Sequence, residues 1–165
     1  MTARKSGARK AIAAAIVSAA LLSGCTATGW IAGSPPAAGS QTELPSLEKV
    51  RNFLFVVDDA GEGVLLGTIA TAERTEVAGI EYAAELEDGS FGDVQPIDFT
   101  AQLAPQSSVQ LEGPELSVSN PDLRAGHLAA VTVDFASSGT VSLQVPVYAS
   151  DHDDFADAWQ AAVGG

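Results

Sequence analysis

Sulfur and aromatic side chains are scarce in this sequence. Cys25 is the only cysteine and Met1 the only methionine among 165 residues, and Phe, Trp and Tyr together make up 6%. A single cysteine excludes an intramolecular disulfide, so the folded part has to be stable by packing alone. The length left after removal of an N-terminal signal fits one domain with its own core and excludes two.

Basic side chains are scarce beyond the first ten residues. Four of the eight lysines and arginines fall within residues 1–10, whereas all 21 acidic residues follow the apolar run at 11–22. Such an acidic surface repels phosphate backbones and anionic headgroups. Nucleic acid is therefore excluded as a partner, and direct docking on anionic lipid is disfavoured.

The first 24 residues have the pattern of a secretory signal peptide. Residues 1–10 carry basic side chains, and residues 11–22 form an apolar run. About a dozen apolar residues are too few to cross roughly 30 Å of hydrocarbon as a helix, and they match the apolar region of a signal peptide. We therefore expect residues 1–24 to be removed on export.

The end of the apolar run reads Leu22-Ser23-Gly24-Cys25. This tetrapeptide resembles the bacterial lipobox, in which an aliphatic residue, a small residue and Gly or Ala precede Cys. The resemblance implies diacylglyceryl transfer to the Cys25 thiol and cleavage between Gly24 and Cys25. The alternative is an ordinary secreted protein with a chance cysteine. Because two acyl chains anchor stably, we expect attachment to the cell membrane, by palmitate-type chains, at its extracytoplasmic face.

Residues 25–46 are rich in Gly, Ser, Ala and Pro and show no apolar periodicity. This composition predicts a flexible tether, and about 20 such residues span roughly 25 Å as a random coil. The pair Trp30-Ile31 offers an interfacial contact as an alternative to full solvation.

Residues 47–149 change to short apolar runs separated by turn residues. This texture predicts an all-β domain, an immunoglobulin/cupredoxin-like antiparallel β-sandwich. The expected strands are 50–57, 64–71, 77–83, 91–94, 97–103, 109–111, 116–118, 128–135 and 141–147.

The last two strands show the clearest alternation. Val131, Val133 and Phe135 share one face of 128–135, and 141–147 alternates in the same way. Each strand should therefore have one buried and one solvated face. Pro146 lacks an N–H, which predicts an edge strand or an outward-facing position.

A short helix is expected in 150–165, at the end of the chain. Ser150 or Asp151 would cap it, and Phe155 and Trp159 lie at i, i+4 spacing on its apolar face.

The segment from Leu123 to Tyr148 carries a family resemblance. It runs Leu-Arg-Ala-Gly-His, then a strand ending Val-Asp-Phe-Ala-Ser-Ser-Gly, then Val-Ser-Leu-Gln-Val-Pro-Val-Tyr. This resembles the end of the periplasmic copper chaperone family (the PCuAC type) and of related actinobacterial lipoproteins of the LpqE type. The resemblance implies a cupredoxin-like sandwich over about 100 residues, reaching back to Val50.

The copper ligands of that family have no counterpart in this sequence. Copper chaperones of this type hold Cu(I) with two Met and two His, because soft thioethers suit that ion. Their His-x-Met would fall near Ser108-Val109-Gln110, which offers only hard oxygens, and Met1 leaves with the signal peptide. The LpqE-type lipoproteins are therefore the better match, and no cofactor is expected.

The two histidines and the acidic clusters are the candidate metal or catalytic groups of the sequence. His152 lies in Asp151-His152-Asp153-Asp154, where helix capping explains the acids better than a metal site. His127 lies in a loop without a ligand pattern, and the loop with Asp58, Asp59 and Glu62 lacks calcium-loop spacing.

Catalytic patterns are missing. The sequence has no Gly-x-Ser-x-Gly, and Gly61–Gly63 indicates a turn without a phosphate loop around it. A carboxylate pair drawn from Glu81, Glu85, Glu87 and Asp98 is conceivable in any acidic domain. We therefore predict a non-catalytic binding or accessory module of the cell envelope with an unidentified protein partner. The alternative is a metallochaperone-like protein for copper or another cation that uses non-standard ligands.

Overall fold

The structure is a computed structural model that describes residues 37–164. The predicted signal peptide, the lipobox with Gly24 and Cys25, and the pair Trp30-Ile31 lie outside the described residues. Within this range the chain forms ten strands, a 3-10 helix and one α-helix. The strands are Ser40–Glu43 (β1), Lys49–Val57 (β2), Glu62–Thr71 (β3), Thr75–Ala84 (β4), Gln95–Ile97 (β5), Ala101–Leu103 (β6), Ser107–Leu111 (β7), Ser117–Ser119 (β8), Leu128–Phe135 (β9) and Gly139–Ala149 (β10). The helices are Pro114–Leu116 (η2) and Ala156–Ala162 (α2).

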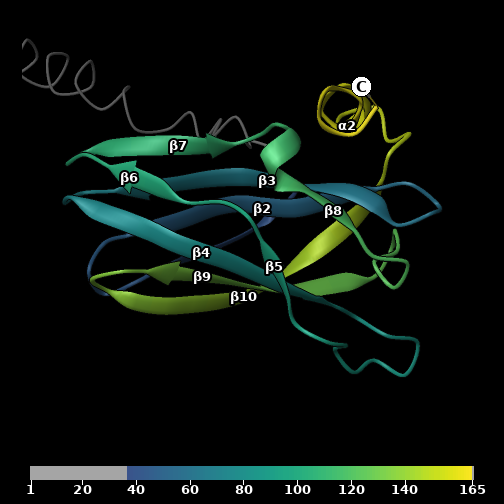
Figure 1. The fold of residues 1–165 in the computed structure, drawn as a ribbon, viewed down its shortest axis with the longest axis horizontal. Helices are drawn as coiled ribbons and strands as arrows, with labels where there is room; N and C mark the ends of the chain where they lie inside the picture. The colour runs from purple at the N-terminus through teal and green to yellow at the C-terminus, as the bar shows by residue number, and fades with distance from the viewer. Residues whose placement is uncertain (1–36, 165) are drawn as a thin grey trace, which may run out of the picture. The chain divides into compact units, whose positions relative to one another are not determined.

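The strands follow one another in the order β5-β4-β9-β10-β2-β3-β7 and fold into two facing layers. Figure 1 shows β2, β3 and β7 in one layer and β4, β9 and β10 in the other. We call the first layer sheet A and the second sheet B. Strand β10 belongs to both, because residues 139–146 pair with β9 and residues 147–149 pair with β2. The predicted all-β sandwich is thus confirmed, with one parallel pairing, β2 with β10, in an otherwise antiparallel arrangement.

Apolar side chains from both layers meet in one core. The largest fully buried side chains include Phe53, Phe55 and Phe135, together with several Leu, Ile and Val residues. Full burial of each such side chain stabilises the fold by about 1.5–3 kcal/mol before entropy is counted. Packing supplies this stability without a disulfide, as the single cysteine requires.

Most predicted strands are present, and the last hairpin has the predicted alternation. Val131, Val133 and Phe135 are buried, and β9 pairs with β10 from Leu128–Pro146 to Phe135–Gly139. The expected strand at 91–94 is wrong, since Phe91 makes only an isolated bridge to Glu85. The expected strand at 97–103 is divided into β5 and β6.

Strand β1 lies in a segment whose composition predicted the tether. It pairs with the start of β2, and the N–H of Gly39 donates to Asn52 Oδ1 at 2.7 Å. An edge strand with polar side chains on both faces shows no apolar alternation, so sequence periodicity does not reveal it.

Pro146 marks an edge position, as predicted, because residues 139–146 of β10 pair with β9 alone and form the edge of sheet B. The residues of β10 that pair with β2 begin at Val147, just after the proline. The missing N–H therefore falls where β10 has not yet joined sheet A.

The C-terminal helix is present but begins later than predicted. It starts at Ala156 after a run of turns, and its N-cap, Phe155, makes no side-chain cap hydrogen bond. The predicted caps Ser150 and Asp151 are therefore wrong. The predicted packing is confirmed, since Phe155 and Trp159 lie against the core. Within residues 37–164, no helix has the length and apolar character that a membrane crossing requires.

Candidate functional site

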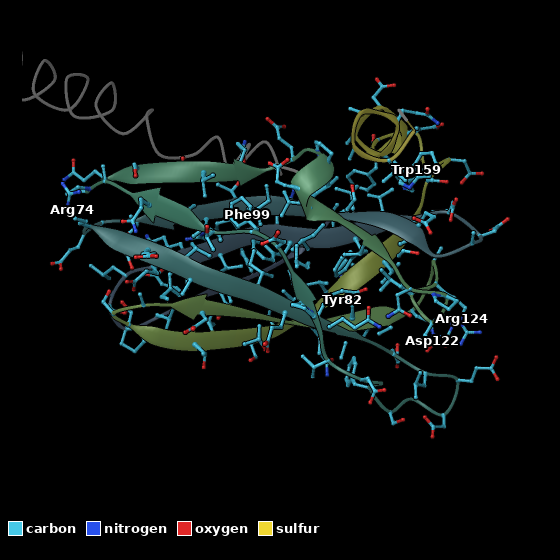
Figure 2. The ribbon with its side chains drawn as sticks, viewed as in Figure 1. Arg74, Tyr82, Phe99, Asp122, Arg124 and Trp159 are labelled. Carbon is cyan, nitrogen blue, oxygen red and sulfur yellow. The ribbon has the colours of Figure 1, made fainter. Side chains whose placement is uncertain are left out.

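Four segments meet at one end of the sandwich, and we call this region the loop end. Backbone hydrogen bonds link these segments to one another or to the adjoining strands: Asn120 N–H to Gly61 O, Glu85 N–H to Leu128 O, and Ser150 N–H to Val57 O. Figure 2 shows Asp122, Arg124 and Trp159 at this end and Arg74 at the opposite one. The segments are 58–61, 85–94, 120–127 and 150–155.

His127 lies beside a carboxylate at the loop end. Its Nδ1 is 4.0 Å from Glu85 Oε2, the oxygen that accepts the Leu128 N–H at 2.8 Å. Nearby in the chain, Arg124 Nη1 lies 3.0 Å from Glu87 Oε1. These contacts tie the 85–94 loop to the segment before β9, so both pairs have a structural role.

His152 is held by aromatic neighbours. Its ring stacks on Phe155 at a centroid distance of 5.0 Å and meets the edge of Tyr148 at 5.2 Å. Nδ1 accepts the N–H of Asp154 at 3.2 Å. The lone pair of Nδ1 is therefore engaged by a backbone N–H.

The acidic loop between β2 and β3 is organised by its own hydrogen bonds. Asp58 Oδ1 accepts the N–H groups of Ala60 and Glu62, each at 2.9 Å. The Ser119 hydroxyl donates to the Glu62 carboxylate. A hollow of about 390 Å³ lies beside this loop, lined by Val57, Asp58, Asp59, Ala60, Ala149, Ser150 and Asp151.

Glu81, Glu85, Glu87 and Asp98, from which a catalytic pair was conceivable, do not lie together in one place. Glu81 and Asp98 line a second hollow, also about 390 Å³, on the edge formed by β4 and β5. Glu85 and Glu87 instead contact His127 and Arg124. In residues 37–164, no three His, Cys, Asp or Glu side chains lie close enough together to hold a metal ion.

The outer face of sheet A carries a polar surface that sequence reasoning did not single out. Lys49, Ala70 and Ser108 are paired across β2, β3 and β7, so their side chains form one row. Arg51, Thr68 and Gln110 form the next row, and the Thr68 hydroxyl donates to Gln110 Oε1. The signal was present in the sequence, because Lys49 and Arg51 are two residues apart on a strand and must share a face.

The segment compared with the family's His-x-Met lies on that surface. Ser108 and Gln110 of β7 are exposed, and Val109 packs against the core. The structure therefore places hydroxyl and amide groups, and no thioether, at Ser108-Val109-Gln110.

The described chain begins close to the loop end. Going backward from β1, the chain runs alongside β2 toward Val57, because Glu43 pairs with Lys49 and Ser40 with Phe53. Tyr148 Oη donates to Ala38 O at 2.9 Å and fixes this path.

No family model and no curated protein matches the sequence. Among solved structures, one described as the apo PmoF2 PCuAC domain matches with a TM-score of 0.45 and 14% identity, over 68% of this chain and 98% of that chain. The assignment of the fold rests on the strand pairing described above.

Proposed function

We propose that this protein is a lipid-anchored, non-catalytic binding module of the cell envelope, of the LpqE type, held at the extracytoplasmic face of the membrane. The observation that carries the proposal is Leu22-Ser23-Gly24-Cys25, placed directly after a basic and an apolar segment. The small residues admit the signal peptidase, and the Cys25 thiol is the acceptor for the diacylglyceryl group.

The charge of the described domain supports anchoring by lipid over direct docking on the bilayer. The chain enters the domain at the loop end, beside Tyr148 and Ala38. Acidic side chains are dense at this end, including Asp58, Asp59, Asp151, Asp153 and Asp154. Anionic headgroups repel such a surface, so the acyl chains have to supply the attachment and the domain stands away from the headgroups.

The test is expression of the full chain in a bacterium that processes lipoproteins, with an alkyne analogue of palmitate in the medium. We expect the wild-type chain to incorporate the label, to partition into detergent and to begin at Cys25 by mass spectrometry. Cys25→Ala should lose the label and the detergent partition. Ser23→Ala keeps a small residue and serves as the matched control. An unlabelled wild-type chain would overturn the anchor.

The metallochaperone alternative has a separate test. Calorimetric titration of the mature protein with Cu(I), Cu(II), Zn²⁺ and Ca²⁺ distinguishes the two functions. We expect flat traces, because within residues 37–164 no three His, Cys, Asp or Glu side chains lie close enough together to hold a metal ion. Stoichiometric sub-micromolar binding would replace the proposed function with metal handling.

A further inference from the structure

A hollow of about 360 Å³ lies on the outer face of sheet A, at the end opposite the loop end. Ala70 forms its floor, because it lies between Lys49 and Ser108 in the row across three strands and has the smallest side chain of the three. This volume is at the lower end of the range for ligand pockets, roughly 300–1,000 Å³. The lining is completed by Leu47, Thr71, Ala72, Gln106 and Ser107.

Cationic groups gather beside this hollow in a strongly acidic protein. Lys49 Nζ and Arg51 Nη2 lie 3.6 and 3.7 Å from the same Glu43 oxygen, Oε2. Two cations therefore share one carboxylate, and both side chains stay about 40% exposed, with values of 40% and 43%. Arg51 Nη1 also donates to Gln41 Oε1 at 3.0 Å, and this contacting group of two cations and one carboxylate carries one unbalanced positive charge.

Two backbone positions on the rim are strained. Leu47 has φ 74° and Gln106 has φ 56°, which are two of the three left-handed non-glycine residues in the described range. A left-handed backbone is unfavourable for residues other than glycine, and strain of this kind concentrates at functional sites. These backbone conformations place the side chain of Leu47, which is 48% exposed, and the exposed amide of Gln106 on opposite sides of Ala70.

The chemistry of the surface distinguishes among anionic partners. The cores of protein interfaces are enriched in aromatic and other apolar side chains, whereas Leu47 is the only large exposed apolar residue lining this hollow. The neighbouring groups are hydroxyls and amides, Thr68, Ser108, Gln106 and Gln110, which both donate and accept hydrogen bonds. Sugar hydroxyls need such dual partners, and a carboxylate on the sugar would pair with Lys49.

We propose that the outer face of sheet A, centred on the hollow over Ala70, binds an acidic polysaccharide of the cell envelope through Lys49, Arg51 and the adjacent hydroxyl and amide groups. This inference rests on the proposed function for its location. Binding itself depends only on the described domain, so a chain that fails to be lipidated can still bind the glycan.

The experiment is calorimetric titration of the purified full chain in detergent with an oligomer of galacturonic acid. A neutral galactose oligomer and poly-glutamate are titrated in parallel. We expect saturable binding of the uronic acid oligomer and no saturable binding of the other two. Lys49→Gln should weaken the affinity by about tenfold or more, as expected for loss of a charged hydrogen-bonding group. Ala70→Leu, which fills the floor, should weaken it similarly without a change in charge.

Arg74→Gln is the matched control, because it removes one exposed positive charge from the β3–β4 turn outside the residues that line the hollow. It should change the affinity by less than about twofold, since an exposed charge outside the contact contributes little. Circular dichroism confirms that each variant is folded. If Lys49→Gln and Arg74→Gln lose the same affinity, the effect comes from the net charge of the protein, and the proposed site is overturned. Equal binding of poly-glutamate would assign the surface to an acidic peptide, and absence of uronic acid binding would also overturn the proposal.

Discussion

The Glu48 carboxylate accepts a hydrogen bond from the Ser138 hydroxyl, which joins the residue before β2 to the turn between β9 and β10. Glu48 is only 3% exposed, and its second oxygen, Oε2, is buried without a hydrogen-bond partner. A buried carboxylate is costly unless neighbouring groups stabilise its charge. This contact therefore makes the link between sheet A and sheet B dependent on the protonation state of Glu48.

Acidification should weaken the fold through Glu48. Burial alone would raise the pKa of Glu48, but hydrogen bonding, led by the Ser138 hydroxyl, outweighs burial and holds this pKa below the ordinary value of 4.5. A carboxyl group whose pKa is lower in the folded chain adds stability above its unfolded pKa and loses that contribution as the pH falls through its folded pKa. Urea unfolding at a series of pH values should show wild-type stability falling below about pH 4.5, and falling less steeply in Glu48→Gln. Parallel curves for the two proteins would contradict this role.

Gly61 should tolerate no side chain, whereas Gly89 should tolerate one at modest cost. Both have a left-handed backbone, with φ 83° and φ 80°. A Cβ on Gly61 would lie 2.1 Å from the carbonyl oxygen of Asn120, but a Cβ on Gly89 would meet nothing within 4 Å. Gly89→Ala should lose about 1–2 kcal/mol from backbone strain alone. Gly61→Ala should lose clearly more in urea unfolding, and similar losses in both variants would refute the close contact.

Trp159 should hold α2 against the sandwich both by packing and through one hydrogen bond. Its Nε1 donates to Glu62 O at 3.0 Å. Trp159→Phe keeps an aromatic ring but leaves that carbonyl without its donor, at an expected cost of about 0.5–1.5 kcal/mol. Gln160→Ala on the exposed side of the same helix should leave the unfolding free energy unchanged. An equal effect of the two substitutions would show that α2 is not held at this point.

Tyr82 should ionise only at a pH above the usual range for tyrosine. Burial raises the pKa of Tyr82 above 10.0, against an opposing hydrogen bond from Asn120. A group whose pKa is higher in the folded chain stabilises the fold below its unfolded pKa and loses that contribution as the pH rises through the folded value. In an absorbance titration of the wild-type chain, the phenolate signal should therefore include a step at unusually high pH. The Tyr82→Phe variant should lack this step. If the step remains, Tyr82 is not the buried phenol that its hydrogen bond to Gln95 at 3.0 Å indicates.

Alternation of apolar side chains predicted the strands of the sandwich well wherever one face of a strand is buried and the other is exposed. Strand β9 begins at Leu128 and ends at Phe135, as expected. Simple alternation does not hold through β4, where it would place Val77, Gly79 and Glu81 on one side. The pairing of β4 with β9 shifts between Val77 and Gly79, so Val77 and Ile80 are both buried. A bulge reverses the faces of a strand, and no local composition marks its position.

The candidate surface could be predicted only in part. The spacing of Lys49 and Arg51 places them on one face, but nothing in the sequence pairs that face with Ser108 and Gln110, which follow more than fifty residues later. The long-range register of β2, β3 and β7 brings these side chains together. The left-handed backbone at Leu47 and Gln106 was equally hidden, since neither residue type favours that conformation.

Strand β10 is a single unbroken segment that serves as the seam between the two layers. The two layers cannot move apart unless β10 separates from β2 or from β9. The domain thus has no internal hinge at that boundary, and opening of the layers coincides with loss of the whole fold. The β10 amide protons that are hydrogen-bonded to β9 or to β2 should accordingly exchange with solvent only by global unfolding.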